Sequence, residues 1–432
     1  MVERLLFLVY RGLMFLLVPL AKLIAPILPK KLRASLAAKN SNSLQRLTSR
    51  PVWIHASSGE IEYAKPILRE LKQRFPQLSV VVSYSSPSFL KLQQGLESCE
   101  LIFAAPFDRP QDIQKIIKAI HPCVVLFART DVWPELSYQL RKASIPTALF
   151  SATISRQSTR SQGLGKYLTR FALNQLSAVF CVSEEDKRIL SEMGVRAPLI
   201  VQGDTRYDQV LYRLQTQSAL SEQTLQKLKT SFSWESTLVL GSTWPEDDEV
   251  LFDSLKHWFE QGGQVIWCPH EVHSSQIAGL QEKIRQRNWK SILWLNWLLE
   301  KSAAEKPQIL IIDQIGILSQ LYTVGKWAFV GGSFKQKVHS VMEALAGDAI
   351  VFTGPHIENN REAVEFSRVS LNDHLFAVNP LQSSAEIVKL LADQRKTQSP
   401  AAMVQKRAGA TTQLADWVEA TVQQQIQDLR RQ

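Results

Sequence analysis

Short apolar runs alternate with longer amphipathic stretches along most of this 432-residue chain. The runs show no apolar–polar alternation of their own, which is typical of parallel strands that are buried on both faces. They predict strands at 52–56, 79–84, 101–104, 124–128, 147–151, 178–183 and 199–202, and then at 237–240, 264–268, 308–312, 326–330 and 349–352. Strands that alternate with helices indicate parallel sheets joined by right-handed crossovers.

The stretches between these runs carry apolar residues at helical spacing. They predict helices at 61–75, 88–94, 111–120, 134–143, 166–176 and 184–193, and in a second series at 246–261, 274–287, 317–324, 338–346 and 387–392. Residues 401–432 predict one long amphipathic helix, and a polar, helix-prone segment at 207–233 separates the two series. We therefore expect an α/β structure of two facing Rossmann-like lobes, with ligands at the carboxyl ends of the strands in an interlobe cleft.

The N-terminal segment differs from both series. Residues 5–28 are apolar enough and long enough to span a bilayer, although two prolines interrupt the helix. At about 100° per residue, Arg4, Arg11 and Lys22 fall within one narrow stripe. Such a stripe favours a helix that lies in a membrane surface with its basic side chains reaching the headgroups, and a single span with snorkelling ends is the alternative.

These patterns divide the chain into three parts. We expect a basic, apolar membrane anchor at 1–40, an N-terminal Rossmann-like domain at 41–210, and a C-terminal Rossmann-like domain at 211–432 that includes the last helix. No convincing cleavage site precedes the basic run at 30–33, so a cleaved signal peptide is not expected. The positive-inside rule keeps that run cytoplasmic, where it suits anionic lipids or phosphorylated glycolipids.

The net charge of +10 is unevenly distributed. Residues 1–50 hold nine Lys or Arg and one acid, a net +8, so the rest of the chain is nearly neutral. Nucleic acid is therefore not an expected partner. The four cysteines, Cys99, Cys123, Cys181 and Cys268, have no metal-site spacing, which indicates small buried side chains in a reducing compartment.

Candidate chemistry begins with the sequence VWIHASSGE at 52–60, which predicts a buried strand, a turn of small residues and the start of a helix. Glu60 then lies at the carboxyl end of a strand, where parallel sheets place ligands. The helix dipole favours its ionised form, which can act as a general base. The alternative is an ordinary glutamate in the first turn of a helix.

The second series has several turns that suit a nucleotide. Gly241-Ser-Thr243 and Gly331-Gly-Ser333 each follow an apolar strand, and their small residues let the backbone approach an anion. His339 and Glu343 stand four residues apart in the helix predicted at 338–346, which places both on one face. His270 and His273 can contact a phosphate or a base, and no further metal ligands accompany them. Neither a Walker A nor a GxGxxG motif is present.

The order of these motifs resembles the 3-deoxy-manno-octulosonic acid (Kdo) transferases of lipopolysaccharide synthesis. The resemblance covers nearly the whole chain. It rests on His55-Ala-Ser-Ser-Gly-Glu60, Pro106-Phe-Asp108, Thr130-Asp-Val-Trp-Pro134, Gly203-Asp-Thr-Arg-Tyr-Asp208, Gly241-Ser-Thr243, Pro269-His270, Asp313 with Gly316 and Tyr322, Gly331-Gly-Ser333, His339 with Glu343, and Gly354-Pro-His356 with Asn359 and Glu362.

The resemblance implies a fold of the GT-B type and an inverting glycosyltransferase. The donor would be CMP-Kdo and the acceptor a lipid A precursor (lipid IVA), at the cytoplasmic side of the cell inner membrane, with no metal or cofactor. Glu60 would be the catalytic base, and the acceptor-binding residues would be Ser58, Gly59, Arg129 and Asp131. The nucleotide-binding residues would be Ser242, Thr243, Pro269, His270, Asp313, Gly316, Gly331, Gly332, Ser333, His339, Glu343, Asn359 and Glu362.

Three positions depart from the family pattern. Arg129 stands where the family has an acid, His270 where it has an arginine, and Val338-His339-Ser340 where it has Gly-His-Asn. Two other functions therefore stay open. One is a related GT-B transferase that moves another CMP- or UDP-activated sugar onto a lipid. The other is a catalytically weakened, membrane-bound homologue that acts as a partner protein.

Overall fold

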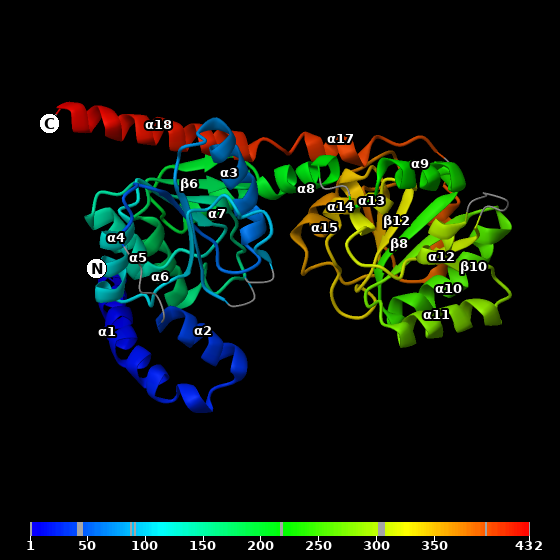
Figure 1. Ribbon diagram of the computed structural model, residues 1–432, viewed down its shortest axis with the longest axis horizontal. Coiled ribbons are helices and arrows are strands. Elements are labelled where there is room, and N and C mark those ends of the chain that lie inside the picture. Colours follow the sequence, from blue (N-terminus) through cyan, green and yellow to red (C-terminus); the bar gives the residue numbers. More distant parts are fainter. Residues whose placement is uncertain are drawn as a thin grey trace. The chain divides into compact units, whose positions relative to one another are not determined.

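The computed structural model describes residues 2–40, 46–86, 89, 92–216, 219–300, 307–393 and 395–431. The chain forms two compact units (Figure 1). Unit 1 comprises Met1–Gln209 together with Arg407–Gln432, and unit 2 comprises Val210–Lys406. The chain therefore leaves unit 1 once and returns to it at the end.

Unit 1 is built on a parallel sheet whose strands follow the order β3-β2-β1-β4-β5-β6-β7. The strands are β1 (Val52–His55), β2 (Val80–Tyr84), β3 (Leu101–Ala104), β4 (Val124–Ala128), β5 (Thr147–Ala152), β6 (Ala178–Cys181) and β7 (Leu199–Val201). The strand order reverses between β1 and β4, so the carboxyl ends of these two strands mark the position where such sheets bind ligands.

Helices cover both faces of this sheet. They are α3 (Ile61–Arg74), α4 (Pro110–Ile120), α5 (Pro134–Lys142), α6 (Gly163–Leu173), α7 (Glu184–Glu192) and the first part of α8 (Thr205–Thr216). Alternate residues of β1 point to opposite faces: Trp53 joins a core with α4, α5, α6 and α7, and Ile54 joins a second core with α3. Burial on both sides explains the unbroken apolar runs in the sequence.

Unit 2 repeats the architecture with a parallel sheet in the order β10-β11-β9-β8-β12-β13-β14. Its strands are β8 (Thr237–Thr243), β9 (Gln264–Pro269), β10 (Ser291–Leu293), β11 (Ile309–Ile311), β12 (Trp327–Val330), β13 (Ile350–Thr353) and β14 (Val378–Pro380). Its helices are α9 (Glu222–Ser231), α10 (Pro245–Glu260), α11 (Ser274–Gln286), α12 (Trp294–Leu299), α13 (Leu318–Leu321), α14 (Met342–Ala346), α15 (Arg361–Phe366), α16 (Ser384–Leu391) and α17 (Pro400–Gln405).

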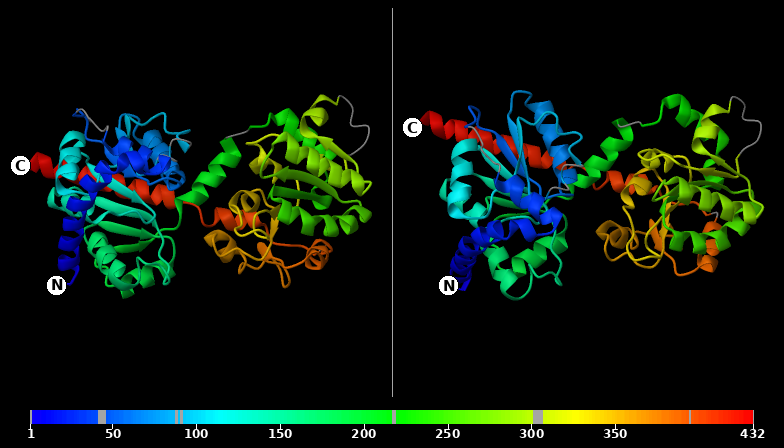
Figure 2. Two further views of the ribbon diagram at one scale, coloured as in Figure 1. Left: turned by 90° about the horizontal axis from the view of Figure 1, so that it is seen from below. Right: turned by 60° about the horizontal axis from the view of Figure 1, so that its bottom comes forward.

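The C-terminal tail corrects two expectations. It is not one helix, because α17 ends at Gln405 and α18 (Ala410–Arg431) begins after Gly409, whose φ of +106° is a left-handed conformation. Nor does α18 belong with residues 211–432, since Leu414, Ala415 and Val418 are buried in the unit 1 core that contains α3 (Figures 1 and 2). Asp208 accepts hydrogen bonds from the backbone of Gly409 and from Thr411, which holds the start of α18.

The N-terminal segment folds back on itself in unit 1. Helix α1 (Val2–Leu23) leads through a 3-10 turn, η1 (Ala25–Ile27), into α2 (Lys30–Asn40) (Figure 1). By length and composition α1 is able to cross a membrane. The expectation that all three stripe residues reach lipid headgroups is wrong for Arg11, because its guanidinium pairs with the carboxylate of Glu135 in α5.

The remaining differences are local. The sequence did not predict the edge strands β10 and β14, each of three residues, or the short helix α12. The helix predicted at 338–346 begins only at Met342, so His339 lies in a loop and does not share a helix face with Glu343. The side chain of Asn359 bonds both the N–H and the C=O of Val338, which diverts that backbone from a helix. The helix predicted at 88–94 lies partly outside the described residues.

Candidate functional site

The loop that follows β1 positions Glu60 at the end of the sheet where the strand order reverses. Glu60 is the residue immediately before α3, yet its side chain does not cap that helix. Its Oε2 instead accepts a hydrogen bond of 3.0 Å from the backbone N–H of Ser58, within its own turn. The half-buried carboxylate therefore has hydrogen-bonding capacity beyond this one contact.

A buried histidine connects the β1 loop to the β4 loop. His55 is fully buried, its Nδ1 lies 2.8 Å from the hydroxyl of Ser83, and its Nε2 lies 3.3 Å from Oδ2 of Asp131. Burial of Asp131 acts to raise its pKa, but the hydrogen bond and charge of His55, together with Trp133 and Arg160, leave the pKa below the ordinary value. Asp131 is thus held as a carboxylate beside the Glu60 loop.

Arg129 also comes from the end of β4 and points towards α3. Its guanidinium lies 5.3 Å from the ring of Tyr63, three residues after Glu60. Its φ of 66° is a left-handed conformation, and its Nε is buried without a hydrogen-bond partner among the described residues. The structure therefore brings Ser58, Gly59, Glu60, Arg129 and Asp131 to the same edge of the unit 1 sheet.

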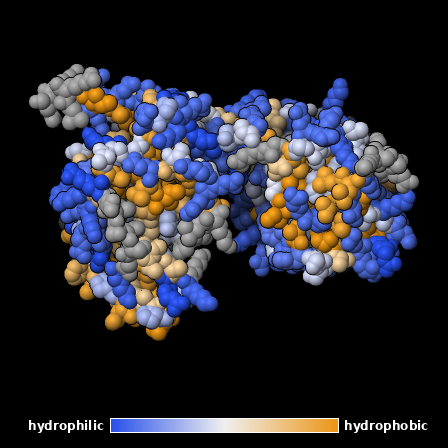
Figure 3. Space-filling model, viewed as in Figure 1, coloured by the Kyte–Doolittle hydropathy of each residue, from blue (hydrophilic) through white to orange (hydrophobic). Residues whose placement is uncertain are grey.

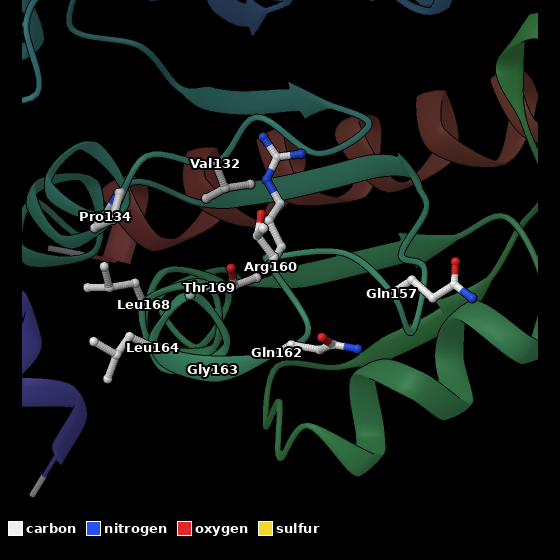
Figure 4. Close-up of a pocket in the computed structure, with 11 residues that line it drawn as sticks. Val132, Pro134, Gln157, Arg160, Gln162, Gly163, Leu164, Leu168 and Thr169 are labelled. Carbon is white, nitrogen blue, oxygen red and sulfur yellow. The ribbon is translucent and has the colours of Figure 1, made fainter. Parts of the chain in front are cut away.

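A hollow of about 580 Å³ opens between the β4 loop and the start of α6 (Figure 4). A smaller hollow adjoins it and shares Val132, Arg160 and Thr169, and Arg129 lines that second space. The charge of Arg160 also helps to lower the pKa of Asp131, although His55 contributes more. The candidate acceptor edge therefore continues into a groove lined by apolar and polar side chains. The residues around the larger hollow are Val132, Pro134, Gln157, Thr159, Arg160, Gln162, Gly163, Leu164, Gly165, Leu168 and Thr169.

In unit 2 the strand order reverses between β8 and β12, and an aspartate joins the loops that follow them. The carboxylate of Asp247 accepts hydrogen bonds from the backbone N–H groups of Trp244 (2.9 Å), Gly332 (2.7 Å) and Phe334 (3.2 Å). The backbone donor of Gly332 in the Gly331-Gly-Ser turn, and that of Phe334 directly after it, are thus already occupied. Ser333 is buried, and its hydroxyl donates to the carbonyl of His356. The glycines serve close packing here, since a Cβ on Gly331 would lie 2.2 Å from the carbonyl oxygen of Ser242.

Three rings gather beside this turn. The Trp244 ring stacks on His270 at 4.4 Å, and His270 stacks on His339 at 4.5 Å. The indole N–H of Trp244 donates to Nε2 of His339 at 3.0 Å. Burial of His339, together with the neighbouring His270, lowers its pKa. The ammonium of Lys335 lies 4.0 Å from the Trp244 ring centroid, so an aromatic surface and a cation stand together.

Comparison with known proteins agrees with this architecture. Residues 30–209 match the family model described as 3-deoxy-D-manno-octulosonic-acid transferase. The chain is 27% identical over 356 residues to the 3-deoxy-D-manno-octulosonic acid transferase of Chlamydia muridarum, which covers 81% of this chain and 80% of that protein. It is 25% identical over 323 residues to the transferase of the same name from Haemophilus influenzae, covering 71% of each. Residues 30–209 are therefore similar to the Kdo transferase family.

Solved structures establish the fold class. The UDP-GlcNAc 2-epimerase from Neisseria meningitidis bound to UDP-GlcNAc superposes with a TM-score of 0.57 at 13% identity, covering 85% of this chain and 99% of that one. A UDP-N-acetylglucosamine 2-epimerase described as putative, from Listeria monocytogenes, gives a TM-score of 0.56 at 13% identity, covering 88% and 98%. The two parallel sheets with their helices are of the GT-B type. At this level of identity the likeness concerns the fold alone.

The other motif residues of unit 2 either support the backbone of neighbouring loops or lie at the ends of strands and helices. Asn359 holds the Val338 backbone, and Asn360 donates to the carbonyl of His339, so both asparagines shape the loop that carries His339. Tyr322 is buried against Gly241, where a Cβ would lie 1.8 Å from its hydroxyl. Pro269 is the last residue of β9, and Asp313 and Gly316 lie in the loop after β11. The carboxylate of Glu343 lies 3.8 Å from the guanidinium of Arg213. Glu362 is buried in the first turn of α15.

Sequence reasoning missed features of these candidate sites. Trp244 was not selected, although an aromatic residue directly after a Gly-Ser-Thr turn is a usable signal. Asp108 was noted only as part of a motif, and the structure explains it: its carboxylate accepts the backbone N–H groups of Glu135 (2.9 Å) and Leu136 (2.8 Å). Asp108 therefore caps α5 from a distant loop, which no local pattern could reveal.

Proposed function

We propose that this protein is an inverting glycosyltransferase that moves Kdo from CMP-Kdo onto a lipid A precursor, lipid IVA, in lipopolysaccharide core synthesis. The observation that carries the proposal concerns the Glu60 carboxylate. It does not cap α3, and among the described residues it accepts one hydrogen bond, from the backbone N–H of Ser58. It stands at the strand-order reversal of the domain that matches the Kdo transferase family model. An inverting displacement needs such a base on the acceptor side.

In the proposed reaction, Glu60 takes the proton from an acceptor hydroxyl while that oxygen attacks the anomeric carbon of Kdo. The bond from this carbon to the CMP phosphate oxygen breaks on the opposite face, and CMP leaves with the electron pair. Ser58 and Gly59 shape the turn that aims Glu60, and the His55–Asp131 pair fixes the neighbouring loop. The proposed role of Arg129 and Asp131 is to hydrogen-bond the acceptor sugar.

Unit 2 is proposed to bind the CMP moiety. The Trp244–His270–His339 rings offer a flat surface on which a base can stack, which supports nucleotide binding. Lys335, a residue outside the predicted set, supplies the positive charge that a single phosphate needs. Asp247 engages the backbone donors of Gly332 and Phe334, and the Gly331 N–H bonds the carbonyl of Gly241, so we assign the glycine turn to shaping the site rather than to holding phosphate.

The proposed location is the cytoplasmic face of the cell inner membrane. It rests on the apolar helix α1 and on the basic character of the first 50 residues. A lipid acceptor requires an enzyme that is held at the bilayer surface. No nucleic-acid partner is proposed, because the excess positive charge is confined to this end.

The test is incubation of the purified protein with CMP-Kdo and a tetra-acylated lipid A precursor, followed by mass spectrometry of the lipid. We expect a mass increase of one or more Kdo units in the wild type and none in Glu60→Ala of equal thermal stability. Absence of any increase under conditions where a known Kdo transferase works contradicts the proposal. Stabilisation by UDP but not CMP indicates another nucleotide sugar, and equal products from Glu60→Ala rule out the catalytic role.

A further inference from the structure

Helix α1 has an inward face that is bonded to unit 1 along much of its length. Phe7 and Val18 are each 5% exposed, and the Phe7 ring stacks on Phe171 of α6 at 4.2 Å. Near the start of the helix, Glu3 forms an ion pair with Arg170, also in α6. Glu3, Phe7 and Val18 lie on one side of the helix at about 100° per residue, so one face of α1 is fixed to the protein.

Two polar residues in the middle of this face reach the start of α5. The hydroxyl of Tyr10 donates to Asp108 at 2.7 Å, and Asp108 in turn accepts the backbone N–H groups of Glu135 and Leu136. The guanidinium of Arg11 binds both carboxylate oxygens of Glu135, at 2.8 and 3.0 Å, and the Glu135 side chain is fully buried. A bidentate pair to a buried carboxylate fixes orientation as well as distance.

The same contacts continue to the candidate acceptor edge. Asp131 lies four residues before Glu135, in the loop that leads from β4 into α5, and its carboxylate bonds His55. Lys39 of α2 lies 5.5 Å from the ring of Trp133 on that loop and 5.4 Å from the ring of Phe107. The α1–α2 segment therefore packs directly on the elements that present Asp131.

The opposite face of α1 is apolar and uncovered. Its large side chains are between 47% and 78% exposed, and the η1 turn adds Ile27 at 82%. Figure 3 shows apolar side chains gathered at the tip of the α1–α2 hairpin. The residues of this outward face are Leu5, Leu8, Val9, Leu13, Phe15, Leu16, Leu17, Leu20 and Leu23. Arg4, Lys22, Lys30 and Arg33 are exposed basic residues of the same α1–α2 segment, and their charge matches an anionic bilayer surface.

We propose that α1 lies in the membrane surface rather than crossing it, and that its inward face holds the loop carrying Asp131 in place for the acceptor. A span would have to pull Tyr10 and Arg11 away from Asp108 and Glu135 and leave two buried carboxylates without these partners. The role given to the loop rests on the proposed function, whereas the position of the helix does not.

The position of α1 is tested by labelling. Arg4→Cys and Lys22→Cys are made separately in a Cys99→Ser background, since both positions are exposed, lie outside the apolar face and stand near opposite ends of the helix. Each protein is bound to sealed phosphatidylethanolamine–phosphatidylglycerol vesicles and treated with a membrane-impermeant maleimide. We expect both cysteines to react from the outside. Protection of either cysteine until the vesicles are permeabilised overturns the in-plane position.

The role of the inward face is tested in detergent, where membrane binding no longer matters. Tyr10→Phe and Arg11→Met are expected to lower kcat/KM for the acceptor by about tenfold or more, with the donor KM unchanged and with partial recovery in Arg11→Lys. The control Leu16→Ser, Leu20→Ser should lose vesicle binding and keep its activity in detergent. Unchanged acceptor kinetics in both inward-face variants overturn the positioning role.

A readout without turnover separates this inference from the proposed function. In protein labelled with 15N-histidine, the ring signals of His55, assigned through His55→Gln, should shift in Tyr10→Phe and Arg11→Met and stay fixed in Leu16→Ser, Leu20→Ser. If wild type transfers no Kdo, this result still decides whether α1 supports the Asp131 loop. Identical His55 signals in all of these variants contradict the support.

Discussion

At the strand-order reversal of each unit, an acid stands at the start of a helix, and the two acids are used differently. In unit 1, Glu60 accepts a backbone N–H from its own turn and leaves α3 uncapped by its side chain. In unit 2, Asp247 is fully buried and accepts three backbone N–H groups from two loops. The comparison shows that position in a parallel sheet is not enough to assign chemistry. What matters is how much of the carboxylate the protein has already engaged.

The strongest way to break this comparison is to neutralise Glu60. Glu60→Gln is expected to lower kcat by about 10²–10⁴-fold, because a general base in a transition state contributes on that scale. The matched control is Glu62→Gln, the same substitution in the first turn of α3. Steady-state rates with CMP-Kdo and the lipid acceptor measure both. A comparable loss in the control would mean that any acid at this helix start suffices.

The structural role of Asp247 predicts an effect on folding instead. Asp247→Ala leaves three backbone donors without their acceptor, and we expect a loss of about 3 kcal/mol in the free energy of unfolding, at about 1–3 kcal/mol for each buried donor that water does not reach. Urea unfolding measures it. Glu246→Ala is the control, since Glu246 is exposed and lies 3.6 Å from Lys335; it should stay near the wild type. If the two variants are equally stable, Asp247 does not organise the turn.

The ring cluster predicts a smaller effect on nucleotide binding. His270→Ala removes the middle ring of the stack and should weaken CMP binding by about tenfold, since base stacking contributes about 1–3 kcal/mol per base. His273→Ala is the matched control, because His273 precedes α11 without capping it through its side chain. Titration calorimetry with CMP distinguishes them. Equal affinities would place the base elsewhere in unit 2.

The smallest expected effects concern pH, and they have opposite signs in the two units. Burial raises the pKa of Asp108 from 3.8 to about 6, so the stabilising effect of its bound proton is lost as pH rises through about 6. His339 has a lowered pKa from burial and the nearby His270, so unit 2 loses stability as pH falls through the ordinary histidine value of 6.5. The unfolding free energy is measured from pH 4 to 7. Its dependence on pH should become weaker in Asp108→Asn and in His339→Gln. An unaltered profile in either variant contradicts its assignment.

The strands of both sheets were readable from the sequence for a physical reason. A parallel strand covered on both faces is apolar at nearly every position, as at Val52–Ile54 or Trp327–Val330, and such runs stand out. The edge strands β10 and β14 have three residues each and include polar or exposed positions, so they leave no comparable pattern. Glu60 could be named as a candidate from the sequence because its strand, turn and helix are contiguous in the chain.

What the sequence could not show depends on partners far along the chain. The basic stripe of α1 was visible, but Glu135, which engages Arg11, lies 124 residues away. The sequence between 338 and 346 has helical spacing, yet Asn359 competes for the Val338 backbone from 21 residues further on. Local periodicity carries no information about partners that are distant in the sequence. Such partners determine both the position of the Arg11 side chain and the loop conformation at Val338.

The return of α18 to unit 1 has a consequence for biosynthesis. A ribosome that makes roughly 5–20 residues per second needs roughly 10–40 s to add Val210–Lys406. During that interval the first sheet has already been synthesised, while the surface that Leu414, Ala415 and Val418 will cover is bare. The first unit therefore stays unfinished until the second has been made, and a message truncated before codon 410 yields a product that never completes the core containing α3.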